Sequence, residues 1–186
     1  APESFDGLQE FFIFREIKIF LMVANFWSTK NHDLLIEAWK KIDYGDGCWL
    51  FLAGQNIKGT IKPHTDAKNR INYLGSRPDA SSLIHFADVC VLSSFVEGCP
   101  NVVLEYIISK RLFVGSNIPA IREIIPEEFH NALLFDNESV QDCVEKLQYA
   151  FNHIGDASVI NSCYHFVSKK YSATQMVKSY LELLNN

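Results

Sequence analysis

Continuous apolar runs alternate along the chain with segments whose apolar residues recur at helical spacing. The run IKIFLMVAN, residues 17–25, is unbroken, which is typical of a strand buried on both faces of a parallel sheet. The next segment, residues 31–42, places Leu34, Leu35 and Ala38 on one helix face. The pattern therefore predicts a buried strand followed by an amphipathic helix.

The same alternation continues through most of the chain. Further strands are predicted at residues 48–54, 71–75, 88–94, 111–117 and 131–136. Helices are predicted at residues 80–87, 100–110, 120–125, 138–153, 157–169 and 173–185. A strand and a helix repeated about six times predict parallel strands with right-handed crossovers. The expected fold is α/β: a single Rossmann-like, doubly wound parallel sheet of about six strands, with helices on both faces.

Composition narrows the classes of function. The 186 residues suffice for one domain with a sizeable core, and the formal net charge is -5 with acids and bases interspersed. A surface that follows nucleic-acid phosphates is usually basic, so we expect no nucleic acid as the main partner. No apolar run reaches the ~18 residues of a membrane span, so no direct span is expected.

The cysteines and histidines indicate neither a disulfide framework nor a metal centre. The five cysteines are odd in number and irregularly spaced, which predicts reduced thiols in a cytoplasmic protein. There is no CxxC pair and no HExxH, and the six histidines are scattered. We therefore expect no metal.

Ligands of doubly wound sheets bind beyond the carboxyl ends of the strands. The loops to search are therefore residues 25–30, 54–60, 75–79, 94–101 and 117–120. The glycines Gly54 and Gly75 end two strands, where backbone can approach a ligand, although plain turn glycines are the simpler interpretation for each alone. Ser76 and Arg77 follow directly and could offer backbone groups to a flat base.

The loop SFVEGCPN, residues 94–101, has the strongest chemical pattern. Pro100 is expected to start a helix, so that N–H groups at 101–103 point into the crevice and favour phosphate. Glu105 lies one turn after Asn101 and can accept hydrogen bonds from ribose hydroxyls, while Glu97 can accept from a second hydroxyl-rich group. This spacing fits a nucleotide sugar; the alternative is that Glu97 is an ordinary loop acid and Glu105 a solvated helix residue.

Lys30 lies near the expected start of the helix at residues 31–42. A cation there opposes the helix dipole by ~0.3–1 kcal/mol, so a bound anion between Lys30 and the helix would explain it. The alternative is a surface lysine before a helix that begins at Asn31.

Taken together, these segments resemble the nucleotide-binding, C-terminal half of the retaining GT-B glycosyltransferases, of the group 1 or family 4 type. EGCPNVVLE resembles the E-x7-E motif of that group, and KNHDLLIEAW resembles its lysine-containing helix. LFLAG, INYLGSRPD, ADVCVLSSFVEG and SNIPAIREII follow in the expected order, so the resemblance covers residues 17–151. It implies a nucleotide-sugar-binding domain at 17–153, with residues 1–16 as linker and pre-strand helix and residues 154–186 as helices that pack back on it.

The resemblance also implies a role for each matching residue. Glu97 would hold hydroxyls of the transferred sugar, Glu105 would bind the ribose, and Lys30 would bind the diphosphate and stabilise it as it leaves. The base would be bounded by main-chain atoms at Ser76 and Arg77. The sugar and diphosphate would be cradled by the backbone of Gly98, Cys99, Pro100, Asn101 and Val102. The family needs no metal and no cofactor; a UDP-sugar is the expected donor.

The implied reaction moves that sugar to a saccharide or lipid-linked acceptor, in bacterial surface polysaccharide synthesis. The location would be cytoplasmic, or at the inner face of the membrane in a full-length protein. GT-B catalysts close two domains over a cleft, and this chain has the length of one. A missing N-terminal acceptor domain is therefore expected, and the chain alone should be inactive.

One position departs from the family pattern. Asn25 lies five residues before Lys30, where an arginine usually supplies the second diphosphate cation, and Arg77 is a candidate to replace it. Asn25 favours the alternative of a non-catalytic nucleotide-sugar-binding module, or a subunit that needs a partner. The presence of Lys30, Glu97 and Glu105 together favours the enzyme. Nucleotide-sugar epimerases share the architecture and fit less well.

Overall fold

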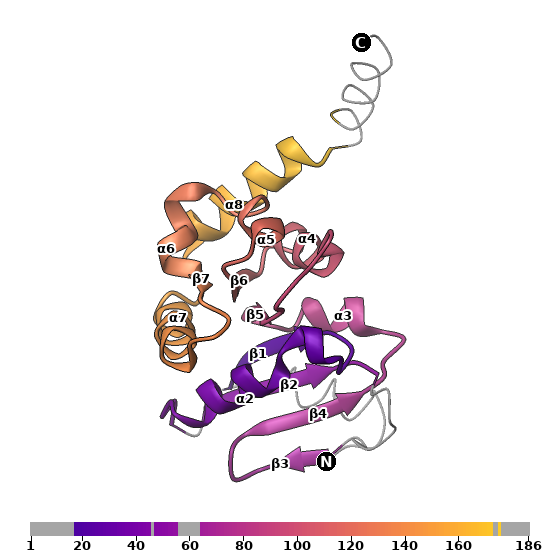
Figure 1. The fold of residues 1–186 in the computed structure, drawn as a ribbon, viewed down its shortest axis with the longest axis vertical. Coiled ribbons are helices and arrows are strands. Elements are labelled where there is room, and N and C mark those ends of the chain that lie inside the picture. The colour runs from indigo at the N-terminus through magenta and orange to yellow at the C-terminus, as the bar shows by residue number, and fades with distance from the viewer. Residues whose placement is uncertain (1–16, 46, 56–63, 173–174, 176–186) are drawn as a thin grey trace.

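The computed structural model describes residues 17–45, 47–55, 64–172 and 175. They form one mostly parallel sheet with helices packed on it, in the order β3-β4-β2-β1-β5-β6-β7 (Figure 1). The strands are β1 (Lys18–Val23), β2 (Cys48–Ala53), β3 (His64–Asp66), β4 (Ile71–Gly75), β5 (Val89–Leu92), β6 (Leu112–Ser116) and β7 (Leu134–Phe135). All neighbours pair in parallel except β3 and β4. The predicted fold class is confirmed.

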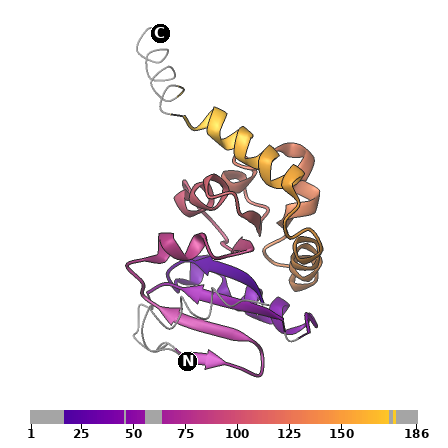
Figure 2. The same ribbon diagram turned by 180° about the vertical axis from the view of Figure 1, so that it is seen from behind.

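Helices cover the sheet, and their pairings follow from the crossovers (Figures 1 and 2). The helix α2 packs against α7, whereas α4 packs against α3 and α8. The chain leaves β1 in one direction and β5 in the other, so right-handed crossovers put α2 and α4 on opposite faces. The helices are α2 (His32–Lys40), α3 (Ala80–Ile84), α4 (Asn101–Ile108), α5 (Pro119–Arg122), α6 (His130–Leu133), α7 (Val140–Asn152) and α8 (Ala157–Lys170), with 3-10 turns η1 (Ser28–Lys30) and η2 (Glu127–Phe129).

Two elements differ from the sequence-based prediction. The antiparallel edge strand β3 was missed because HTD carries no apolar run; its His64 stacks on Tyr73 of β4 at 4.3 Å between ring centroids. The strand expected at residues 131–136 is only β7, because residues 130–133 form α6. A short apolar run cannot by itself distinguish a buried helix turn from a strand. The helix expected at 173–185 lies outside the described residues.

The core lies against the central strands β1, β2 and β5. Phe20, Met22 and Phe51 are buried completely, as expected for strands covered on both faces. All five cysteines are free thiols, and four of them are buried; burial raises the pKa of Cys48 to about 12. No helix within the described residues is long and apolar enough to cross a membrane.

Candidate functional site

The strand order reverses at β1, and this positions a cavity. The chain runs from β1 outward to β2 and β4, then returns to β5 on the other side of β1. The β1–β5 ladder pairs Phe20 with Val89 and Leu21 with Cys90, in the middle of β1 and at the start of β5. Further along, the Val23 N–H donates to the hydroxyl of Tyr106, on α4, at 2.8 Å. A crevice outside such a switch point is where doubly wound sheets bind ligands.

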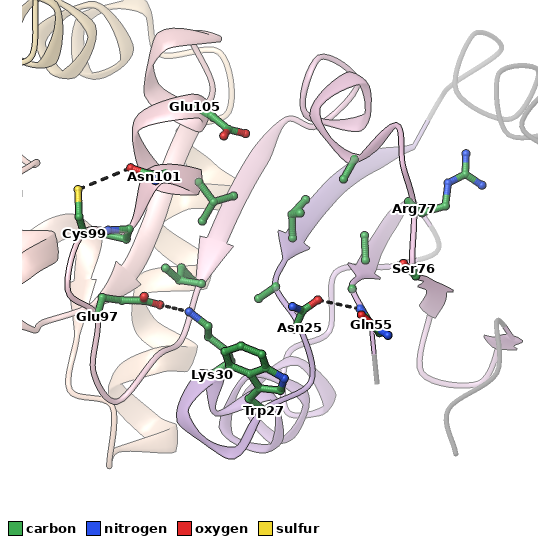
Figure 3. Close-up of a pocket in the computed structure, with 18 residues that line it drawn as sticks. Asn25, Trp27, Lys30, Gln55, Ser76, Arg77, Glu97, Cys99, Asn101 and Glu105 are labelled. Carbon is green, nitrogen blue, oxygen red and sulfur yellow. Dashed lines mark hydrogen bonds and ion pairs between the residues drawn. The ribbon is translucent and has the colours of Figure 1, made fainter. Parts of the chain in front are cut away.

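A cavity of about 450 Å³ opens there (Figure 3). All the predicted site residues except Gly75 and Gly98 line it. The lining also includes Trp27 and Gln55, which sequence reasoning missed although both lie in loops that follow β1 and β2. Their position after a strand was the available signal. Three of the remaining lining residues, Val23, Ala53 and Leu92, come from the strand ends themselves.

The two glycines that end β2 and β4 shape the backbone. A Cβ on Gly54 would lie 1.9 Å from the carbonyl oxygen of Ala24, so the ends of β1 and β2 approach as only glycine allows. The Gly54 N–H donates to the carbonyl of Gly75, whose φ of 68° also favours glycine. The backbone geometry therefore explains why each of these positions is a glycine. Gly75 does not line the cavity.

Lys30 and Glu97 form an ion pair across the cavity wall. Lys30 Nζ lies 2.6 Å from Glu97 Oε1, with side chains 20% and 10% exposed (Figure 3). The Ser94 hydroxyl donates to the same oxygen at 2.6 Å. Glu97 therefore has one oxygen bound by two donors, and its Oε2 has no hydrogen bond among the described contacts. The two residues are 67 positions apart in sequence.

Buried polar groups hold the two loops that carry this pair. The hydroxyl of Ser93 lies 2.9 Å and 3.0 Å from the carbonyl oxygens of Lys30 and Asn31. The Asn31 amide donates to the carbonyl of Asn137, whose own amide donates to the carbonyl of Ser94 at 3.2 Å. Asn31 has a φ of 50°, a left-handed conformation that asparagine tolerates. The loops after β1 and β5 are thus cross-linked before any ligand arrives.

A buried histidine follows this network. His32 stacks on Phe26 at 4.0 Å between ring centroids and is 7% exposed. Burial lowers the pKa of His32 to about 4, although a hydrogen bond to the backbone of Ala24 acts in the opposite direction. His32 is therefore neutral at pH 7 and supports the loop rather than contributing charge to the cavity.

The start of α4 differs from the prediction. The helix begins at Asn101, and Pro100 is its N-cap rather than its first residue. The Asn101 N–H donates to the carbonyl of Cys99, and the Val103 N–H donates to the carbonyl of Pro100, each at 2.9 Å. The expectation that the N–H groups of residues 101–103 are free to point into the crevice was therefore wrong for Asn101 and Val103. Glu105 is exposed, and its carboxylate extends from α4 toward the cavity (Figure 3).

The second expected cation is engaged elsewhere. The Arg77 guanidinium donates twice to the Asp79 carboxylate, at 2.7 and 2.6 Å, and points away from Lys30 (Figure 3). This bond holds the pKa of Asp79 below its usual range. Asn25 Oδ1 accepts from the Gln55 N–H at 3.0 Å, which ties the loops after β1 and β2 together. The described residues contain no group of three or more His, Cys, Asp or Glu side chains that could hold a metal.

The sequence profile of the family described as glycosyl transferases group 1 matches residues 17–153. The chain belongs to this family. An uncharacterized glycosyltransferase of Haemophilus influenzae is 25% identical over 145 residues, which cover 74% of this chain and 40% of that protein.

Solved structures show the same fold. A glycosyltransferase from Rickettsia africae superposes with a TM-score of 0.80 at 19% identity, over 98% of this chain and 51% of its own. HepE of Anabaena, solved with UDP, superposes with a TM-score of 0.78 at 16% identity, over 100% of this chain and 53% of its own. The catalytic domain of cholesterol-α-glucosyltransferase from Helicobacter pylori gives 0.66 at 18% identity, over 82% and 98%.

The chain corresponds to part of these longer proteins. It spans about half the length of the Rickettsia and Anabaena proteins and 40% of the Haemophilus protein. Its fold is that of the C-terminal half of GT-B retaining glycosyltransferases.

Proposed function

We propose that this group 1 domain binds a nucleoside diphosphate sugar, with UDP-sugars first among the candidates. The observation that carries the proposal is the single cavity wall that holds Lys30, Glu97 and Glu105 at the switch point of the sheet. A carboxylate suits ribose hydroxyls, and an ammonium suits a diphosphate. The presence of UDP in the structure of Anabaena HepE supports the choice of nucleotide.

In this proposal Lys30 exchanges partners. The Glu97 carboxylate holds the Lys30 ammonium, and the diphosphate takes that ammonium when a donor binds. Glu97 is then available to the hydroxyls of the sugar. Negative charge on the diphosphate grows as the sugar departs, so an ammonium beside it stabilises the transition state more than the bound donor.

The complete reaction is transfer of the sugar to a saccharide or lipid-linked acceptor. Such transfer requires donor and acceptor in attack geometry with water excluded, and this domain supplies the donor side only. We infer that the chain binds the donor and that turnover requires a second, acceptor-binding domain.

A non-catalytic nucleotide-sugar-binding module is the second candidate. Two observations favour it: Asn25 lies where the family resemblance implies an arginine, and Arg77 is bound to Asp79. The cavity then offers one ammonium to a diphosphate, which lowers the expected leaving-group stabilisation. Such a module would bind a donor with the same residues and would not gain turnover from a partner domain.

Calorimetry with UDP, GDP and ADP at low salt tests the proposal. UDP should bind measurably, and Glu105→Gln should weaken it about tenfold, because a charge-assisted hydrogen bond contributes roughly 1.5–3 kcal/mol. The exposed Glu127→Gln is the matched control and should leave the affinity unchanged. Absence of binding by all three nucleotides would overturn the proposal.

A further inference from the structure

Asn137 connects the loop after β1 with the loop after β5, although it does not itself line the cavity. It lies between β7 and α7, and β6 separates β7 from β5 in the sheet. Its carbonyl accepts from the Asn31 amide at 2.9 Å, and its own amide donates to the carbonyls of Ser94 and Phe95 at 3.2 and 3.4 Å. A third loop, distant in sequence from the other two, therefore holds both of them.

The start of α2 points to a role for this connection beyond local structure. An asparagine at an N-cap ordinarily accepts hydrogen bonds from the first N–H groups of its helix. Asn31 is the N-cap of α2, but its side chain makes no such bond, and its φ of 50° is the left-handed conformation. Its amide donates to Asn137 instead. The side chain therefore stabilises the contact between distant loops rather than the helix that it precedes.

The loop that contains Asn137 is fixed by hydrogen bonds of its own. The Asp136 N–H donates to the Asp142 carboxylate at 2.7 Å, and the Glu138 N–H donates to the Asp136 carboxylate at 3.0 Å. Asp142 belongs to α7, which packs against α2. Asn137 is therefore anchored to a helix that already contacts the helix after Lys30.

The other end of the connection meets the residues that position the ion pair. The Ser94 hydroxyl donates to Glu97 Oε1 at 2.6 Å, and the Phe95 N–H donates at 2.8 Å to the carbonyl of Thr29, the residue before the lysine of the pair. The Asn137 amide binds the carbonyls of the same two residues, 94 and 95. A lysine ammonium is a point charge on a flexible stem, so its contact with a diphosphate depends on where the backbone and its partners hold it.

We propose that Asn137 is a positioning residue of the candidate site: it keeps Lys30 where its ammonium can pass from Glu97 to a diphosphate. This inference rests on the proposed function, because it gives Asn137 an effect on the binding of a nucleoside diphosphate. Asn137 acts only through the two loops and contacts no ligand. Its removal should therefore weaken the part of the affinity that comes from Lys30 and leave the rest.

Calorimetry with UDP in two backgrounds tests this dependence on Lys30. Asn137→Ala removes the amide and keeps the carbonyl that accepts from Asn31, and it should weaken UDP about threefold or more. In a Lys30→Met background the same substitution should leave the UDP affinity unchanged, because the ammonium that it positions is absent. A loss by the same factor in both backgrounds would show a general structural role and overturn the inference.

Two further variants separate the connection from the stability of its loop. Ser139→Ala removes the side-chain cap of α7 two residues after Asn137, so it should lower stability and leave the UDP affinity unchanged. Asn31→Gly removes the other end of the connection, and glycine tolerates the φ of 50°, so it should weaken UDP as Asn137→Ala does. If Ser139→Ala weakens UDP as strongly as Asn137→Ala, or if Asn31→Gly does not weaken it, the inference fails.

Hydrogen exchange examines the connection without a ligand. Exchange at the Phe95 amide, which donates to the Thr29 carbonyl, should accelerate in Asn137→Ala and not in Ser139→Ala. An unchanged rate in Asn137→Ala, or an unchanged affinity where wild type binds UDP, overturns this inference and leaves the proposed function in place. Failure of wild type to bind UDP overturns the proposed function, and this inference with it.

Discussion

The two sides of the first cavity are built differently. On the side of β1 and β5, side chains define the wall, because Lys30 is paired with Glu97. The Ser93 hydroxyl donates to the Lys30 carbonyl, and the Ser94 hydroxyl donates to the Glu97 carboxylate. On the side of β2 and β4, the close approach of two backbone segments shapes the wall, since a Cβ on Gly54 would lie 1.9 Å from the Ala24 carbonyl oxygen. Changes to the Lys30–Glu97 pair should therefore alter ligand binding, whereas a change at Gly54 should alter folding.

The largest expected effect comes from the backbone side. Gly54→Ala places a methyl group 1.9 Å from the Ala24 carbonyl oxygen and should lower the free energy of unfolding by about 3 kcal/mol or more. Gly98→Ala is the matched control, because its methyl group meets nothing within 4 Å; it should be neutral or stabilise by about 0.4–1 kcal/mol. Urea unfolding of both variants measures this. If Gly54→Ala and Gly98→Ala had equal free energies of unfolding, the proposed difference between the two sides would be contradicted.

The next effect is a pH dependence of stability that comes from His32, which supports the loop carrying Lys30. Burial lowers the pKa of His32 from 6.5 to about 4, so the unfolded chain binds more protons between these values. The His32 contribution to the free energy of unfolding is complete above pH 6.5 and declines as the pH falls toward 4, by up to about 3 kcal/mol.

His32→Phe keeps an aromatic ring beside Phe26 and cannot titrate. Urea unfolding at pH 7 and pH 4.5 should therefore show a smaller loss of stability in this variant than in wild type. Identical pH dependence in the two proteins would show that His32 is charged in the folded state or accessible to water.

The smallest effect should come from a contact within the side of β1 and β5, where β1 meets α4. Tyr106→Phe removes the hydroxyl that accepts the Val23 N–H and leaves that group without this partner. We expect a loss of about 1 kcal/mol in the free energy of unfolding. Hydrogen exchange at the Val23 amide should accelerate in the variant, and an unchanged rate would show that the bond does not protect it.

The sequence predicted the elements that rest on apolar pattern, and the exceptions have physical reasons. The strands β1, β2 and β5 are apolar runs buried on both faces, and each was found within two residues of its ends. The edge strand β3 carries HTD and depends on its pairing with β4, which no local pattern reveals. At 130–133 the segment HNAL forms a helix turn, although its last three residues were interpreted as part of a strand.

The same distinction between local and long-range features applies to the candidate site. The position of Lys30, Glu97 and Glu105 after strands was enough to predict that they share one end of the sheet. Their partners were not predictable: Lys30 and Glu97 are 67 residues apart, and their pairing depends on how two loops are held. The Arg77–Asp79 bond, by contrast, joins residues two apart and could have been anticipated as a reason why Arg77 is not available to a diphosphate.

The central claim is that the Lys30 ammonium passes from Glu97 to a diphosphate, and a double-mutant cycle on UDP affinity tests it most directly. Calorimetry would compare wild type, Lys30→Met, Glu97→Gln and the double variant. We predict that Lys30→Met weakens UDP about tenfold, that Glu97→Gln preserves or strengthens it, and that the double variant matches Lys30→Met. A Glu97→Gln variant that loses UDP as strongly as Lys30→Met, with the two losses adding in the double variant, would contradict the exchange of partners.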